Sequence, residues 1–286
     1  MTVTDVTPVV TNDGPPPQRV ALQLLRRPTF AISAAILVFW VLAPIAVKIL
    51  GLDPYEQAGD ANLSPGGDHL LGTDNLGRDV LIRLLAGAGP ILTVAPAATL
   101  LAAVLGTILG LVAGYRRGLV DDLLMRSFDI LNAVPGIVAV LLVASAFGRS
   151  SFTIVLAIGV FFTPLIARTV RSAVLVEMGK QYVEASRTQG ESTWRILVSE
   201  LLPNVRPALV VEATIRLGYA IFVSAGLSFL NLGAQAPSPD WGLVVAQNRI
   251  FIQTSWWTVA FPALAIITLV VAINLIADNL REVLGR

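Results

Sequence analysis

The chain contains six apolar stretches, each close to the roughly 20 residues that an α-helix needs to cross a bilayer. They occupy residues 29–50, 89–113, 130–147, 152–176, 207–230 and 257–277. In the hydrocarbon core every backbone N–H and C=O must be paired within the protein, so stretches of this length are predicted to be helices. Arg168 and Arg171 follow the apolar part of the fourth stretch, which we interpret as one helix whose inner end projects into the cytosol. The sequence therefore predicts an all-α, polytopic membrane protein with six transmembrane helices.

Composition supports a membrane protein and argues against several other classes. Hydrophobic residues make up 55% of the 286 residues and charged residues only 14%, against about 25% charged residues in soluble domains. The net charge is +1, and the 20 Lys and Arg are spread along the chain, so no nucleic-acid partner is predicted. Cysteine is absent and His69 is the only histidine, so neither thiolate chemistry nor a metal site is predicted.

The distribution of Lys and Arg predicts the orientation, because cytosolic loops carry an excess of these residues. With the N-terminus inside, the inner segments hold 14 of the 20 Lys and Arg and the outer segments hold 4. We therefore predict that both termini are cytosolic. The predicted organisation is a cytosolic tail with a basic interfacial segment at 1–28 and a six-span domain at 29–286. Its outer loops are residues 51–88 and 231–256, and its main cytosolic loop is residues 177–206.

A charged island interrupts the apolar pattern at residues 184–203. A helical pattern runs into it from Ala173, and Gly190 is predicted to end that helix by adopting a positive φ. Ser192 or Thr193 can cap a second helix, which Pro203 is predicted to end. The apolar stripe of this second helix consists of Trp194, Leu197, Val198 and Leu201. The stripe must be covered by lipid, by the chain itself or by a partner protein, so docking into a partner and an interfacial helix on the inner leaflet both stay open.

The island resembles the EAA loop of ABC-importer permeases, in which Glu-Ala-Ala, three residues and Gly are followed twelve positions later by Leu-Pro. The matching residues are Glu184, Ala185, Gly190, Leu202 and Pro203, and Ser186 replaces the second alanine. By this resemblance, the helix after Gly190 is a coupling helix that fits into a groove of an ATPase subunit.

Most of the remaining chain resembles the C-type permeases of dipeptide and oligopeptide importers. The similar segments are residues 69–83, 125–135 and 226–281. The chain departs from the family pattern at Glu200, Ser224, Ala277 and Asn279. The resemblance implies a type I ABC importer permease (MetI-like) fold in the bacterial inner membrane and a role in peptide uptake. Nickel or a nickel chelate, which related C-type permeases carry, is the alternative cargo.

The resemblance also implies the partners. They are a homologous B-type permease subunit, two ABC ATPase subunits or one ATPase with two nucleotide-binding domains, and an extracytoplasmic substrate-binding protein. ATP and Mg²⁺ are expected in the ATPase, because Gly179-Lys180 is followed by Gln181 and does not form a P-loop here. We therefore expect a permease subunit that is not itself an enzyme and holds no cofactor. An ion-coupled secondary transporter is disfavoured, since Glu212 is the only carboxylate within a span.

Two further groups of charged residues are candidate sites. The first lies in the outer loop and consists of Asp74, Arg78, Asp79 and Arg83. This segment is interpreted either as an interfacial helix or as an outer gate that contacts the binding protein. The second is Glu212 and Arg216, spaced i, i+4 on the fifth span. They are interpreted either as a structural ion pair or as contacts for a charged peptide terminus in the translocation pathway.

Overall fold

The computed structural model describes residues 23–284, and in that range all regular secondary structure is helical. The predicted tail at 1–28 therefore lies mostly outside the described residues. The longest helices are α2 (Pro28–Ile49), α4 (Ala88–Arg116), α7 (Ser151–Glu177), α10 (Leu202–Phe229) and α12 (Trp257–Leu284). Each lies in a segment that is long and apolar enough to cross a membrane, which confirms five of the six predicted spans.

The third predicted span is not one straight helix. The region folds into α5 (Leu119–Asn132) and α6 (Gly136–Phe147), and the two helices are bent by 80°. Pro135 explains the break, because a proline disfavours helical geometry at the residue before it, here Val134. Pro135 itself has an extended ψ of 127° and precedes the first residue of α6. The structure therefore has six crossings only if this bent pair counts as one.

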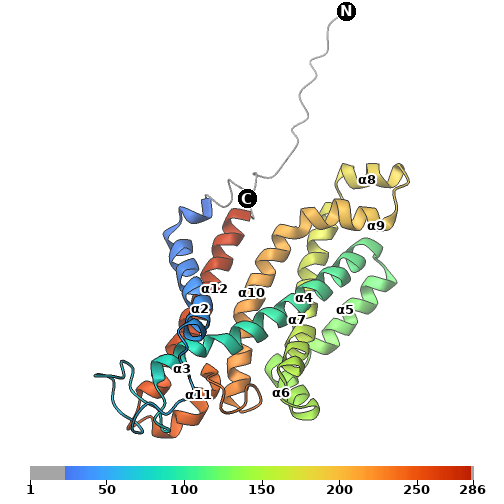
Figure 1. The fold of residues 1–286 in the computed structure, drawn as a ribbon. Helices are drawn as coiled ribbons and strands as arrows, with labels where there is room; N and C mark the ends of the chain where they lie inside the picture. Colours follow the sequence, from blue (N-terminus) through green and yellow to red (C-terminus); the bar gives the residue numbers. More distant parts are fainter. Residues whose placement is uncertain (1–22, 285–286) are drawn as a thin grey trace, which may run out of the picture.

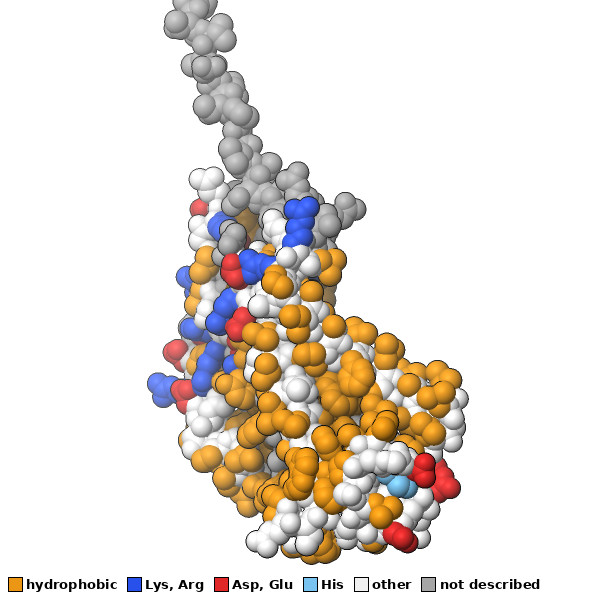
Figure 2. All heavy atoms as spheres, turned by 90° about the vertical axis from the view of Figure 1, so that its left-hand side faces the viewer, with side chains coloured by type: hydrophobic (Ala, Val, Ile, Leu, Met, Phe, Trp, Pro, Cys, Tyr) orange, Lys and Arg blue, Asp and Glu red, His pale blue; other side chains and the backbone are white. Residues whose placement is uncertain are grey.

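The short helices lie at the two ends of the long ones. At the end that also holds the C-terminus lie α8 (Gln181–Thr188) and α9 (Thr193–Arg195) (Figure 1). At the opposite end lie α3 (Val80–Ala86), the loop that precedes it, and α11 (Trp241–Asn248), which the 3₁₀ turn η2 (Arg249–Phe251) follows. Figure 2 shows Lys and Arg, with some Asp and Glu among them, gathered toward the upper part of the molecule, a broad hydrophobic surface below them, and further Asp and Glu with a histidine at the lower end.

The core is built on the tight packing of α4 against α7. Gly106, Gly110 and Gly114 form a smooth stripe on α4, and they lie against α7. A Cβ on Gly110 would approach the backbone oxygen of Ala167 to 2.6 Å, which leaves no room for a side chain. Such small-residue stripes allow helices to approach closely in membranes, where van der Waals packing drives their association. These glycines therefore serve the packing of α4 on α7.

We expect Gly110→Ala to destabilise the protein by about 1–3 kcal/mol, because the methyl group would force α4 and α7 apart. Thermal unfolding of the purified protein in detergent measures the change. Gly89→Ala is the matched control on the same helix, since its Cβ would meet only Pro44 at 3.6 Å. Equal unfolding temperatures for the two variants would contradict the assignment.

Candidate functional site

The turn at the centre of the charged island has the predicted geometry. Gly190 adopts a φ of +75° directly after α8, and Ser192 caps α9 by accepting a hydrogen bond from the backbone N–H of Arg195. The helix that precedes Gly190 differs from the prediction. It does not run on from the fourth span, because α7 ends at Glu177 and α8 begins afresh at Gln181.

Pro203 does not end the second helix, contrary to the prediction. The chain stays helical from α9 through a π-helical turn, η1 (Ile196–Leu201), into α10, so residues 193–229 form one continuous segment. Pro203 is the second residue of α10 and directly follows the π-helical turn, where the hydrogen-bond pattern of the helix changes and a missing N–H can be accommodated. The widened π-turn immediately before it is a form of helix that often occurs at functional positions. The second helix of the island is therefore the beginning of the fifth span.

The predicted apolar stripe is divided between the interior and the surface. Leu197 and Leu201 are buried in the chain's own core, and Val198 is half-buried. Trp194 is 74% exposed, at the edge of an apolar groove of about 490 Å³ between α4 and the start of α10. Of the four stripe residues, Trp194 and part of Val198 are therefore accessible to another protein. The EAA-like residues Glu184, Ala185 and Pro203 are exposed, and Leu202 is half-buried.

A hydrogen-bond network that the sequence did not reveal fixes α8 to the long helices. The hydroxyl of Tyr182 donates to Glu177 at the end of α7 over 2.8 Å, and Asn204 on α10 donates to the same hydroxyl over 3.2 Å. Lys180 completes the network with an ion pair to Glu177 at 2.7 Å. Burial and the hydrogen bond to Glu177 raise the pKa of Tyr182, which keeps the hydroxyl protonated and able to donate. The three helices α7, α8 and α10 are thus joined at one point.

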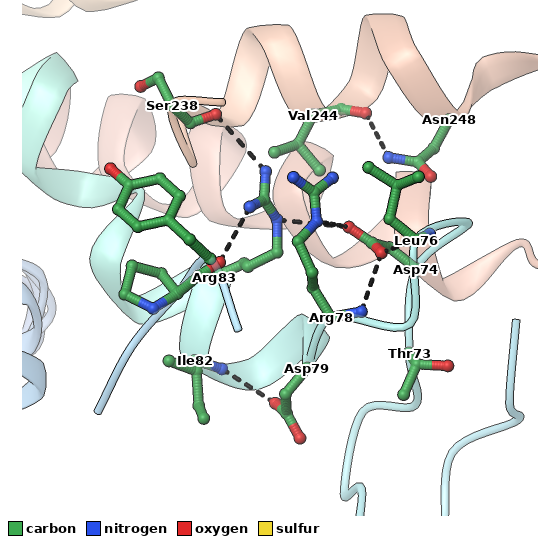
Figure 3. Close-up of polar contacts among 12 residues, drawn as sticks. Thr73, Asp74, Leu76, Arg78, Asp79, Ile82, Arg83, Ser238, Val244 and Asn248 are labelled. Carbon is green, nitrogen blue, oxygen red and sulfur yellow. Dashed lines mark hydrogen bonds and ion pairs between the residues drawn. The ribbon is translucent and has the colours of Figure 1, made fainter. Parts of the chain in front are cut away.

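Three charged residues before and within α3, Asp74, Arg78 and Arg83, face one another (Figure 3). Asp74 is 1% exposed and accepts hydrogen bonds from the Nε of Arg78 at 2.7 Å and from the backbone N–H of Arg78 at 3.0 Å. Arg83 lies on the other side of the same carboxylate, with its Nε 3.5 Å away. Arg83 also donates to the carbonyls of Pro54 and Ser238. We refer to Asp74, Arg78 and Arg83 as the Asp74 cluster; it connects the two loops at this end.

Asp79 has a separate role at the start of α3. Its carboxylate caps the helix by accepting from the backbone N–H of Ile82, and its second oxygen lies 2.8 Å from Nδ1 of His69. The interfacial helix expected for this segment therefore begins only at Val80. Asp79 and the Asp74 cluster are largely buried within the chain. Their role as an outer gate that contacts the binding protein stays a prediction.

Glu212 and Arg216 form the predicted ion pair on α10. The Nε of Arg216 lies 2.6 Å from Oε1 of Glu212, and both side chains are largely buried. The guanidinium of Arg216 also lies over the ring of Tyr219, 5.3 Å from its centroid. Glu212 lines a hollow of about 390 Å³ between α10 and α12, and a second hollow, of about 410 Å³, lies further along the same two helices. We call these two hollows together the α10–α12 groove.

Residues 106–286 match the family of binding-protein-dependent transport system inner membrane components. The chain belongs to this family. Its all-helical architecture, with five long apolar helices and one bent pair, is accordingly the MetI-like fold of these permeases. The chain is thus a multi-pass membrane component of a transport system.

Several curated relatives in this family are named for the peptides that they transport. The dipeptide transport system permease protein of Alkalihalophilus pseudofirmus is 36% identical, over 94% of this chain and 89% of the relative. The di/tripeptide transport system permease protein of Pseudomonas aeruginosa is 39% identical, over 81% and 79%. The glutathione transport system permease protein of Pectobacterium atrosepticum is 37% identical, over 89% and 86%.

In this inner membrane component, Asp240 is a buried carboxyl group that sequence reasoning did not single out. It is 2% exposed, and it caps α11 by accepting from the backbone N–H of Leu243. Burial raises the pKa of Asp240 from the ordinary 3.8 to about 6. The group therefore loses its proton less readily in the folded protein than in the unfolded chain.

We expect this shift to make the unfolding free energy fall as the pH rises from about 4 to about 6, by at most about 3 kcal/mol. In this window the folded protein binds the Asp240 proton and the unfolded chain has already released it, so low pH favours the folded state. Asp240→Asn keeps an oxygen that can cap α11 and should remove this part of the pH dependence. Chemical denaturation of both proteins across the window provides the measurement. An unchanged slope in the variant would refute the assignment.

Proposed function

We propose that the chain is a permease subunit of an ABC importer that moves dipeptides and oligopeptides into the cytoplasm. The observation that carries this proposal is the similarity, over most of both chains, to relatives named for dipeptide, di/tripeptide and glutathione transport. The exposure of the EAA-like residues of α8 supports the proposal that an ATPase binds there.

The proposed assembly contains a homologous B-type permease subunit, an extracytoplasmic binding protein, and two ATPase subunits or one ATPase with two nucleotide-binding domains. ATP and Mg²⁺ are bound by the ATPase. Both termini, α8 and α9 face the cytosol, and α3 and α11 face the outside. The concentration of Lys and Arg toward one end supports this orientation, because cytosolic segments are enriched in these residues.

The continuous helical segment at residues 193–229 suggests how ATP hydrolysis drives transport. Trp194 and α8 are at its exposed end, and Glu212 lies further along the same segment, where it lines the α10–α12 groove. A displacement of α9 by the ATPase therefore moves α10 without an intervening loop. The network of Glu177, Tyr182 and Asn204 makes α8 follow the same motion. Closure of the ATPase then shifts the spans between inward- and outward-facing states.

Reconstitution of the complete transporter tests the proposal. The complex purified through this chain should contain ATPase subunits, and proteoliposomes should accumulate defined dipeptides and oligopeptides only when ATP is supplied. Nickel and a nickel chelate serve as competing cargoes. Accumulation driven by an ion gradient without ATP, or of nickel but no peptide, would overturn the proposal.

A further inference from the structure

The outer of the two hollows in the α10–α12 groove combines space with polar side chains. It measures about 410 Å³, and its lining includes Gly218 and Tyr219 from α10 and Asn274 and Asp278 from α12. Gly218 is required for this arrangement, because a Cβ at that position would lie 2.7 Å from the side-chain oxygen of Asn274. The two helices bring together residues that are more than 50 positions apart in the sequence.

The polar groups of this hollow have no partners in the described part of the chain. Among residues 23–284, the hydroxyl of Tyr219, the amide of Asn274 and the carboxylate of Asp278 form no hydrogen bond, and Asp278 forms no ion pair. Glu212, one hollow away, is by contrast paired with Arg216. An unpaired carboxylate beside a free amide and a free hydroxyl is an acceptor site for a cationic donor.

The depth of these groups makes their lack of partners significant. Asn274 lies 17 residues after Trp257, the first residue of α12, so it is about 26 Å along the helix axis at 1.5 Å per residue. The hydrocarbon core is about 30 Å thick, which places Asn274 within it and Asp278 near its inner boundary. Ionisable and polar groups at this depth face a water-filled cavity or a protein interior, because exposure to lipid is costly.

The other charges around the hollow leave Asp278 available to a ligand. Arg216 is bound to Glu212 and lies over the ring of Tyr219. Arg281 follows Asp278 by three positions on α12, but it lines the neighbouring hollow and forms no ion pair with Asp278. The hollow therefore has one free negative charge, with an amide and an aromatic hydroxyl beside it.

We propose that this hollow binds the N-terminal ammonium group of the peptide in transit, with Asp278 as the counter-charge and Asn274 and Tyr219 as hydrogen-bond acceptors. The inference rests on the proposed function, since a peptide with a free amino terminus is the cation that such a transporter would meet. It names a specificity: a free amino terminus is preferred over a blocked one. The ammonium group donates three hydrogen bonds, which matches the three acceptors.

Transport kinetics of the reconstituted complex test this proposal. Asp278→Asn should raise the KM for a dipeptide with a free amino terminus at least about tenfold, the value of one charge-assisted hydrogen bond, with a smaller change in kcat. The N-acetylated dipeptide should be a poor substrate of the wild type, and the variant should discriminate less between the two peptides. Asp122→Asn, which alters an exposed carboxylate on α5, is the control that should leave both constants unchanged.

The transport measurements distinguish a failure of the proposed function from a failure of the binding site in the hollow. If the wild-type complex does not take up peptides at all, the proposed function is wrong. If the wild type transports the dipeptide and Asp278→Asn does so with the same KM and the same discrimination, only the inference about the hollow is overturned.

Thiol labelling provides a second measurement that does not depend on turnover. The chain has no cysteine, so Asn274→Cys introduces a single reporter beside the intact Asp278. In the assembled complex, a methanethiosulfonate with an ammonium group should modify this thiol several-fold faster than one with a sulfonate group. The dipeptide should slow the reaction, and the charge preference should disappear when Asp278→Asn is added. A thiol that reacts in the isolated chain but not in the complex would show that the partner permease covers the hollow and would overturn the proposal.

Discussion

Trp194→Ala is expected to release the ATPase from the permease while the chain still inserts into the membrane. Trp194 is the large apolar side chain that α9 exposes, at 74%, beside the EAA-like helix α8. Truncation of a tryptophan at the centre of an interface reduces the binding free energy by about 2–4 kcal/mol, so the affinity for the ATPase should fall by about 30- to 1000-fold. Copurification of the ATPase, followed by a titration of the purified ATPase onto the permease in detergent, measures the loss. Coupled, ATP-dependent uptake should fall in parallel.

A matched control separates docking from a general effect of losing an exposed aromatic residue. Trp256 is 54% exposed and lies before α12 at the opposite end of the protein. Trp256→Ala should leave ATPase binding unchanged. If the Trp194→Ala variant retained the ATPase fully, α9 would not be the docking element. That result would favour the alternative in which this helix lies on the inner leaflet.

Asp74→Ala should destabilise the protein by about 3–5 kcal/mol, because it removes the counter-charge of two buried guanidinium groups. Arg78 and Arg83 both contact this carboxylate and are themselves buried. The carboxylate also accepts backbone hydrogen bonds from Leu76 and Arg78, so the loop before α3 loses its main organising group. Unfolding of the purified protein in detergent measures the difference.

Two further variants define the cause of that loss. Asp68→Ala removes an exposed carboxylate from the same loop and should change the unfolding free energy by less than about 0.5 kcal/mol. Asp74→Asn keeps an oxygen for the backbone donors but removes the charge. If Asp74→Asn were as stable as the wild type, the loop hydrogen bonds and not the ion cluster would account for the effect.

The sequence predicted the long spans because lipid imposes a simple rule on length and hydropathy. It also predicted the turn at Gly190, since a positive φ after a helix favours glycine. Pro203 was interpreted wrongly, and the effect of Pro135 was not foreseen. Pro135 breaks a span that hydropathy alone presents as continuous, and Pro203 is accommodated in the first turn of a helix that it was expected to stop. Local sequence does not distinguish these outcomes, because packing around each proline decides them.

The candidate sites were harder to predict, since they depend on contacts between distant segments. The i, i+4 spacing was sufficient to pair Glu212 with Arg216. Spacing did not show that Leu201 is buried against the chain's own helices. It also did not place Asn274 opposite Gly218, because only the packing of α10 on α12 brings them together.

The bend between α5 and α6 has a consequence for how the protein is made. With 12 residues, α6 is about 18 Å long, well short of the roughly 30 Å hydrocarbon core. It packs on α7, and α5 is attached to the same helix by the ion pairs of Asp121 with Arg171 and Asp129 with Arg168. A helix this short is expected to insert poorly into the membrane by itself. During synthesis, α5 and α6 should therefore leave the translocon together with α7, as a hairpin that becomes stable only when the full-length helix has emerged.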